Sequence, residues 1–332
     1  MKKQKTNLIW CVALALPMLM IGSLPASAQY SYQMIGPDEG LFPSAFGINN
    51  AGMVVGQDFD GTSDFSFVYD MKRGDYTRID DGLLVYDISN NGVMVGGVGG
   101  VCAIRDKKGN ITEFYPPSFG PLSFCVARGV NSNDKVSGFL IDDQGGWLGF
   151  IYDSRHSTYE EFLPSFQTIP QGINAQGQNV GSVFLFPDEA YEGSPDGIYA
   201  YLREADGAVK YFAINEAFPG SSRARGISES GLIAGWYLDA VTFEFKSYVT
   251  TLSSGTEFEE IELTDDQRVH TSPCDPDLPP PPPGFEAFSD VYAQGIRNDG
   301  VVVGLCQDYW FNPTTGEFQG LNSFGFIATP IK

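Results

Sequence analysis

The sequence contains the ten-residue motif Gly47-Ile48-Asn49-Asn50-Ala51-Gly52-Met53-Val54-Val55-Gly56, and variants of it recur along the chain. The further copies start at Asp87, Gly129, Gly172, Gly226 and Gly295. All six have Ile or Val at the second place and Gly at the tenth. The motif predicts a β-hairpin, because an Asn side chain can open a type I turn and a glycine with positive φ can close it. The tenth glycine marks a close approach of backbone, as crowding near an axis would require.

The spacing of the copies predicts the architecture. Successive copies start 40, 42, 43, 54 and 69 residues apart. Repeats of about 40 to 50 residues with four short strands are typical of propeller blades. Third strands are expected at 65–69 and 149–152, and fourth strands at 76–79 and 111–114. Helical periodicity is absent. The predicted fold is therefore all-β, a β-propeller of six four-stranded blades.

The two ends of the chain are expected to meet. A lone strand at 30–35 would complete the last blade beside 324–329 and remove an exposed edge. In that blade both Tyr309-Trp310-Phe311 and Phe324-Gly325-Phe326-Ile327 resemble a third strand, and one of them is expected to belong to an inserted hairpin. We predict a single domain at 29–332, with a Pro-rich loop insertion at about 252–288 whose prolines favour polyproline II. A shorter insertion is expected at 182–197.

Residues 1–28 have the features of a secretory signal peptide. Three lysines precede an apolar run, and Ala26-Ser27-Ala28 fits the small-residue cleavage pattern. We predict cleavage after Ala28 and a secreted or periplasmic protein. A retained membrane anchor is the alternative, although Pro17 interrupts the apolar run.

Cysteine usage is consistent with export. Removal of the signal leaves Cys102, Cys125, Cys274 and Cys306, an even number that suits an oxidising compartment. Three pairings are possible. Proximity along the chain favours Cys102 with Cys125 and Cys274 with Cys306.

The charge of the chain argues against several partners. It has 41 acidic and 20 basic residues, a formal net charge of −21, and three of the lysines lie in the signal. This acidity disfavours nucleic acid and anionic lipid and favours cations or neutral ligands, unless it serves solubility alone. No partnership with nucleic acid or membrane is expected after signal removal, and we expect a monomer.

Residues that would identify a reaction are scarce. Only His156 and His270 are present, in different repeats, so neither a histidine metal cluster nor a Ser-His-Asp arrangement is predicted. Both are expected at the surface. A glycosidase needs paired carboxylates, but with so many acids no pair stands out.

One acidic loop could bind calcium. Asp58, Asp60 and Asp64 surround Gly61, and Ca²⁺ prefers such oxygen ligands. The alternative is an ordinary Asp-Gly hairpin turn. No other cofactor is predicted.

A ligand-binding ring is predicted from position. Two places before the Ile or Val of each motif, on the same strand face, stand Phe46, Tyr86, Arg128, Gln171, Arg225 and Gln294. If this strand is innermost, the six side chains lie at one depth near the axis. They suit a sugar or a carboxylated ligand, through stacking and bidentate hydrogen bonds. Alternatively they pack between blades, with the arginines paired to acids.

The motif Gly-Ile-Asn-x-x-Gly-x-Val-Val-Gly followed by an aromatic strand resembles the probable extracellular repeats of the HAF family, found in secreted bacterial proteins. The ending Gly325-Phe326-Ile327-Ala328-Thr329-Pro330 is similar to that family's last strand. The His-Ala-Phe triplet is not intact, because the corresponding places read Phe65-Ser66-Phe67, Leu148-Gly149-Phe150, Lys246-Ser247-Tyr248 and Phe324-Gly325-Phe326. The resemblance implies a secreted, propeller-like repeat protein and little about activity.

Three classes of function follow. The first is an extracellular binding or interaction module, engaging glycans or a cell-surface protein, with Trp147, Trp236 and Trp310 able to stack on sugars. The second is a carbohydrate-active enzyme, a glycoside hydrolase or polysaccharide lyase, because propellers host such activities on loops. The third is a structural component of an extracellular matrix.

Overall fold

The computed structural model describes residues 30–35, 43–162, 167–214, 220–251, 258–261 and 280–331, with backbone alone at 258–261 and 322. Within these ranges the chain forms 24 strands and no helix. The all-β prediction is therefore confirmed for the described part of the chain. Among the described residues, no helix has the length and hydropathy that a membrane span requires. The predicted signal, residues 1–28, lies outside them.

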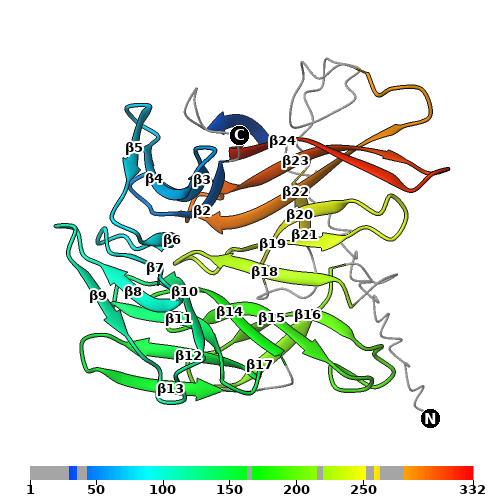
Figure 1. Cartoon of the computed structure of the whole chain (residues 1–332). Coiled ribbons are helices and arrows are strands. Elements are labelled where there is room, and N and C mark those ends of the chain that lie inside the picture. Colours follow the sequence, from blue (N-terminus) through cyan, green and yellow to red (C-terminus); the bar gives the residue numbers. More distant parts are fainter. Residues whose placement is uncertain are drawn as a thin grey trace, which may run out of the picture.

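The strands form antiparallel meanders that follow one another in chain order (Figure 1). The first sheet contains β2 (Ser44–Ile48), β3 (Met53–Phe59), β4 (Asp64–Asp70) and β5 (Asp75–Ile79). The second contains β6 (Leu84–Ile88), β7 (Met94–Val98), β8 (Val101–Arg105) and β9 (Ile111–Phe114). The predicted third and fourth strands are thus present in both sheets.

The middle of the chain forms one eight-stranded sheet. It begins with β10 (Phe124–Val130), β11 (Lys135–Ile141), β12 (Trp147–Asp153) and β13 (Thr158–Phe162). It continues with β14 (Gln167–Ile173), β15 (Asn179–Leu185), β16 (Gly197–Arg203) and β17 (Val209–Phe212). A single parallel pair, Trp147 with Gln167, joins these two halves. Each half is otherwise a separate meander of four strands.

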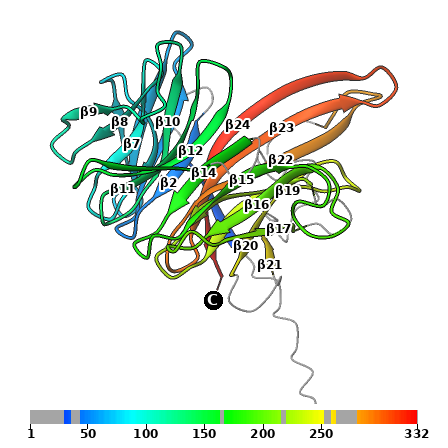
Figure 2. The ribbon, with the colours of Figure 1, turned by 90° about the horizontal axis from the view of Figure 1, so that it is seen from below.

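The last two sheets complete the arrangement. One contains β18 (Ser222–Ile227), β19 (Ile233–Leu238), β20 (Phe245–Thr250) and β21 (Phe258–Ile261). The other contains β22 (Glu286–Ile296), β23 (Val302–Asn312), β24 (Glu317–Pro330) and β1 (Tyr30–Ile35). The sheets are arranged around a common axis as in a β-propeller (Figures 1 and 2). Hydrophobic clusters lie between successive sheets.

The N-terminal strand pairs with the C-terminal strand, as expected. β1 runs antiparallel to β24 from Tyr30 opposite Pro330 to Ile35 opposite Gly325. Tyr30 and Ile35 are both buried, in two different hydrophobic clusters. The closing strand therefore contributes to the core on both sides of its sheet.

The expectation of an inserted hairpin in this sheet is wrong. Tyr309, Trp310 and Phe311 lie at the far end of β23, the same strand that starts in the sixth motif. They pair with β22 on one side and with the start of β24 on the other. The three long strands simply extend beyond the rest of the sheet, and Figure 2 shows β23 and β24 projecting from the body.

The repeated motif folds as predicted. The Asn49 side-chain oxygen accepts hydrogen bonds from the backbone nitrogens of Ala51 (3.0 Å) and Met53 (3.1 Å), which holds the turn. In all six hairpins the residue that closes the turn has positive φ, namely Gly52, Gly92, Asp134, Gly177, Gly231 and Gly300. Asp134 adopts this conformation at φ 59°, in keeping with the tolerance of Asp for the left-handed region.

Glycines at the first and the tenth place of the motif have different roles. A Cβ on Gly56 would lie 2.0 Å from the Ser44 carbonyl oxygen and 2.5 Å from the Phe67 ring. The tenth glycine is therefore required by the backbone of its own hairpin partner, and in five of the six copies also by an aromatic ring of the third strand, and not by crowding at the axis. That crowding occurs at the first glycine, since a Cβ on Gly129 would lie 2.2 Å from the carbonyl oxygen of Gln171 in the next innermost strand.

One predicted disulfide is confirmed. Cys102 in β8 and Cys125 in β10 are bonded and fully buried, so the bond links two successive sheets. Cys306 is also disulfide-bonded and buried. Cys274 lies outside the described residues, so its pairing with Cys306 stays a prediction.

Candidate functional site: the axial cavity

A β-bulge in the innermost strand of each repeat positions the predicted ring. The ladder between the first two strands shifts register between Ala45 and Gly47, and the same shift recurs in the other five hairpins. A bulge leaves an extra residue outside the regular pairing and re-aims its side chain. The residues at these shifts are Phe46, Tyr86, Arg128, Gln171, Arg225 and Gln294. In β14 the shift also includes Gly172.

The structure brings all six bulge residues together. They line one cavity of about 70 Å³. By this measure a single water needs about 10 to 15 Å³, so the cavity has room for several waters or a small polar group. The six positions predicted from the motif thus share one site, which we call the axial cavity.

The axial cavity has three tiers that follow from the order of residues along each innermost strand. The bulge residues form the floor. The second place of each motif supplies an aliphatic belt, made of Ile48, Ile88, Val130, Ile173, Ile227 and Ile296. Turn residues form a polar mouth that includes Asn50, Asn90, Ser132, Glu229 and Asn298. A ligand would therefore meet polar groups, then apolar side chains, then the floor.

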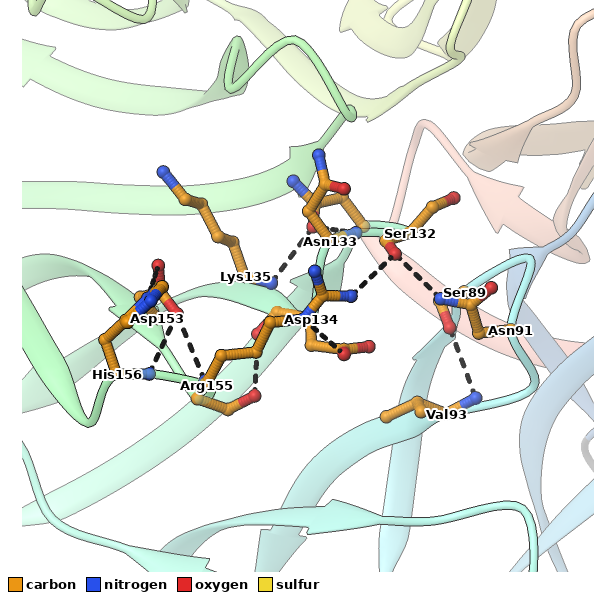
Figure 3. A network of polar contacts seen from close by, with 12 residues as sticks. Ser89, Asn91, Val93, Ser132, Asn133, Asp134, Lys135, Asp153, Arg155 and His156 are labelled. Carbon is orange, nitrogen blue, oxygen red and sulfur yellow. Dashed lines mark hydrogen bonds and ion pairs between the residues drawn. The ribbon is translucent and has the colours of Figure 1, made fainter.

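Hydrogen bonds between successive turns hold the mouth. Asn49 donates to the Ser89 carbonyl (3.1 Å), and Asn131 donates in the same way to that of Asn174 (2.8 Å). Figure 3 shows the link between the second and third turns, where Asn91 donates to the Ser132 carbonyl (2.7 Å). Further links are Asn174 to Ser228, Ser230 to Asn298, and Asn298 to Asn50. These contacts form a closed circle around the cavity entrance.

Glu229 places a carboxylate at this entrance. Its oxygens accept hydrogen bonds from the Ala175 backbone nitrogen (2.6 Å) and from the Ser132 hydroxyl (3.1 Å). The side chain thus spans three successive turns. Because both oxygens are engaged, Glu229 is held as part of the mouth.

Aromatic rings support the arginines of the floor. The Arg128 guanidinium lies 3.8 Å above the Tyr86 ring, and the Tyr86 ring lies 5.1 Å from that of Phe46. Arg225 lies 5.3 Å from the Trp236 ring, which Arg223 approaches to 4.4 Å. Such cation–π contacts stabilise a partly desolvated cation without neutralising it.

Arg128 and Arg225 have no carboxylate partner among the described residues. Burial lowers the pKa of both guanidiniums, and for Arg225 the positive charges of Arg128 and Arg223 lower it further. The Nε atoms of Arg128 and Arg225 and the side-chain nitrogen of Gln171 are buried without a hydrogen-bond partner. The alternative prediction, that the arginines pair with acids between blades, is therefore not what the structure shows.

Asp87 is the wall residue that the sequence prediction missed. It stands at the first place of its motif, where the other five copies have glycine. Its two oxygens accept hydrogen bonds from the backbone nitrogens of Ile88 (2.8 Å) and Val130 (2.9 Å). Burial nevertheless raises its pKa to about 6. In the sequence, the one signal that could have identified Asp87 is its replacement of the glycine that the other five copies have at the first place of the motif.

The carboxylates proposed for calcium are not assembled into a site. Asp60 accepts backbone hydrogen bonds from its own turn and pairs with Arg78 (2.9 Å). Asp58 is buried and accepts a hydrogen bond from the Tyr76 hydroxyl (3.3 Å). With Asp64 they do not form a metal-ligating group, and none is found anywhere in the described ranges. The loop is the ordinary hairpin turn, with Gly61 at φ 86°.

The other predicted contact residues lie away from the axial cavity. Trp147 stacks on Phe139 with ring centroids 5.1 Å apart, and Trp310 lies on the projecting part of β23. Trp236 is buried beneath the arginines and does not line the cavity. His156 is exposed and contacts Asp153 (3.1 Å; Figure 3), while His270 lies outside the described residues.

Comparisons with known proteins give a likeness of shape only. No family model matches the chain, and no curated protein matches it in sequence. Among solved structures it is similar to TolB from Acinetobacter baumannii, at 11% identity and a TM-score of 0.47 over 68% of this chain and 64% of that one. It is also similar to the β-propeller domain of the trilobed protease from Pyrococcus furiosus (13% identity, TM-score 0.41, 84% and 97%). A third is the oligogalacturonate lyase from Vibrio parahaemolyticus (11% identity, TM-score 0.43, 92% and 98%). The chain thus spans about two thirds of TolB.

Proposed function

We propose that this chain is an exported six-bladed propeller of the HAF type that acts as an extracellular binding module, with glycans as its first ligand class. The six-blade count is supported by the single residue pair that joins the halves of the eight-stranded sheet. It is also supported by the six turns that contact one another in a closed circle. The HAF assignment rests on the motif and on the last strand.

The observation that carries the binding function is the convergence of the bulge residues on one cavity. Three buried donors there, on Arg128, Arg225 and Gln171, have no partner in the described structure. A buried donor without a partner costs about 1 to 3 kcal/mol, and such groups concentrate at functional sites. A ligand that accepts hydrogen bonds would recover this cost. Phe46 and Tyr86 add aromatic surface for a sugar ring.

Export is supported by the disulfide between Cys102 and Cys125. Disulfides form and persist in oxidising compartments such as the periplasm and the extracellular medium. Together with the signal-like segment at 1–28, this favours a secreted or periplasmic protein.

A carbohydrate-active enzyme is the second candidate, because one feature of the cavity favours it. Asp87 is a buried carboxyl with its pKa raised to about 6, and a general acid works best when its pKa lies near the operating pH. Screening polysaccharides for new reducing ends or unsaturated products tests this candidate. Release of either product, abolished in an Asp87→Asn variant, would favour the enzyme over the binding module.

The binding function is tested with the exported chain and a panel of glycans. Pull-down on insoluble polysaccharides and calorimetry with soluble oligosaccharides give the ligand. We expect binding that falls in a Tyr86→Leu variant, which removes the aromatic face, and is kept in His156→Ala, which changes an exposed side chain. Absence of binding to every glycan would contradict glycans as the ligand class.

A further inference from the structure

The floor of the axial cavity is cationic in a strongly acidic protein. The chain has 41 acidic and 20 basic residues, so carboxylate partners are abundant. Six described arginines pair with a carboxylate within 4 Å, namely Arg73, Arg78, Arg105, Arg155, Arg203 and Arg297. Arg128, Arg223 and Arg225 do not, and of these Arg128 and Arg225 line the axial cavity. Within the described structure, the fold therefore keeps these two largely buried cations without a carboxylate partner at one place.

The hydrogen-bonding groups of the floor are also unbalanced. Arg128 Nε, Arg225 Nε and the Gln171 side-chain nitrogen are donors without partners, and Gln171 is only 5% exposed. The carboxylates of the wall and the mouth already have partners, since Asp87 accepts from two backbone nitrogens and Glu229 from Ala175 and Ser132. The cavity thus offers spare donors and spare positive charge. A group that supplies acceptors and negative charge fits both.

We propose that the floor binds a carboxylate, with Arg128 and Arg225 as its cationic partners and Gln171 as an additional donor. The inference rests on the proposed function, because it names the ligand class for the same cavity. A guanidinium presents a planar fork of N–H groups that matches the two oxygens of a carboxylate. The size of the cavity suits a small planar anion better than a bulky one.

The upper tiers define what can be attached to the carboxylate. Apart from Asp87, whose oxygens accept backbone hydrogen bonds, the belt above the floor is aliphatic, and the mouth supplies Asn and Ser groups that can hydrogen-bond hydroxyls. A small hydroxylated carboxylic acid fits this order, either free or as the terminal acidic sugar of a glycan. The lowered pKa of both arginines has the same meaning, because an anion would offset the cost of burying them.

The test compares an acid with its neutral counterpart. Calorimetry with the exported chain measures binding of glucuronate, glucose and acetate at constant ionic strength. We expect glucuronate to bind at least about tenfold more tightly than glucose, because hydrogen bonds to charged groups are worth about 1.5 to 3 kcal/mol. Acetate is expected to bind weakly and to compete with glucuronate. Equal affinity for glucuronate and glucose would overturn the proposal.

Variants assign the effect to the floor. Arg128→Gln and Arg225→Gln should each weaken glucuronate binding about tenfold or more and reduce the preference for glucuronate over glucose. Arg105→Gln is the matched control, because Arg105 is a partly buried arginine that pairs with Asp81 (2.6 Å) and does not line the axial cavity. Thermal melting without ligand separates binding from structure. A purely structural role predicts destabilised variants with unchanged acid selectivity, and that result counts against the proposal.

The outcomes distinguish this inference from the proposed function. Acetate and free glucuronate binding without binding to any glycan supports the carboxylate site and removes the glycan function. Binding of neutral glycans with no preference for acids supports the glycan function and rejects the carboxylate site. If the variants fail to fold, the wild-type preference for glucuronate over glucose and its competition by acetate still decide. Competition by inorganic phosphate equal to that by acetate would replace carboxylate selectivity by general anion binding, and would overturn it.

Discussion

Replacing Asp87 by glycine should change how the stability of the protein depends on pH. Glycine is the residue that the other five motifs have at this place, so the substitution suits the local backbone. Burial raises the pKa of Asp87 from 3.8 to about 6, although two backbone hydrogen bonds favour its charged form. One pKa unit corresponds to about 1.4 kcal/mol, so ionised Asp87 costs the folded state roughly 3 kcal/mol.

The direction of this pH dependence follows from which state, folded or unfolded, binds the proton of Asp87 more tightly. The folded-state pKa exceeds the unfolded one, so between about pH 4 and pH 6 the folded protein holds the proton and the unfolded chain does not. The contribution of Asp87 to stability is therefore most favourable below about pH 4. It declines as the pH rises to about 6 and is constant above that value.

Urea unfolding from pH 3.5 to 7.5 measures this effect as a difference between the two proteins. Relative to wild type, Asp87→Gly should gain roughly 3 kcal/mol between pH 4 and pH 6.5. Arg128, Arg225 and Glu229 line the same cavity and are present in both proteins, so the difference reports on Asp87. Asp206→Asn, which removes a carboxyl group at an exposed turn, is the control. A flat or falling difference for Asp87→Gly would refute the burial argument.

Three further predictions concern the packing of the sheets and are tested by chemical unfolding. Replacing Cys102 and Cys125 together by alanine opens a link over 23 residues and should cost about 3 kcal/mol, and a loss below about 1 kcal/mol would contradict the chain-entropy argument. Gly235→Ala should cost about 3 kcal/mol or more, because its Cβ would lie 2.1 Å from the Arg223 carbonyl oxygen. Gly145→Ala, in open space at positive φ, should cost only about 1 to 2 kcal/mol, so equal losses would argue against the steric cause. Ser247→Ala should cost about 2 kcal/mol, because the hydroxyl donates to Val291 (2.8 Å) and accepts from Ala293 (2.8 Å) in the next sheet. An unchanged urea midpoint in this variant would mean that water replaces the hydroxyl.

The parts of the fold that the sequence predicts are those fixed by local chemistry. The turn of the motif depends on a side-chain oxygen such as that of Asn49 and on a residue with positive φ, and both are visible in one copy of the motif. The ring of bulge residues follows from register, because each stands at the same distance from the turn. Recurrence of the motif at six places then makes the common site predictable without knowledge of the contacts.

The parts that were missed depend on contacts between distant residues. The sequence around Asp60 suggests a calcium ligand, but in the structure Asp60 pairs with Arg78 of a nearby strand. The aromatic run from Tyr309 to Phe311 suggests a separate strand, but in the structure it continues β23. An aromatic run alone does not reveal whether a strand ends or continues. Net charge also does not reveal that Arg128 and Arg225 lie together at the axial cavity, with buried Nε atoms that have no hydrogen-bond partner in the described structure. Total charge and the charge at a buried site are independent quantities.

The bulge places one residue of each motif outside the regular ladder, so the fold constrains its identity less than that of its neighbours. The Ile or Val at the second place, the turn and the tenth glycine are occupied with packing, capping and hairpin pairing, so each is constrained by the fold. The bulge residue is outside the regular ladder, and its side chain points to the cavity instead of the core. This explains how the same motif can hold Phe, Tyr, Arg and Gln at one place. Because six such places meet at one cavity, the chemical character of its floor is set by six side chains, and their combination in this chain is aromatic on one side and cationic on the other.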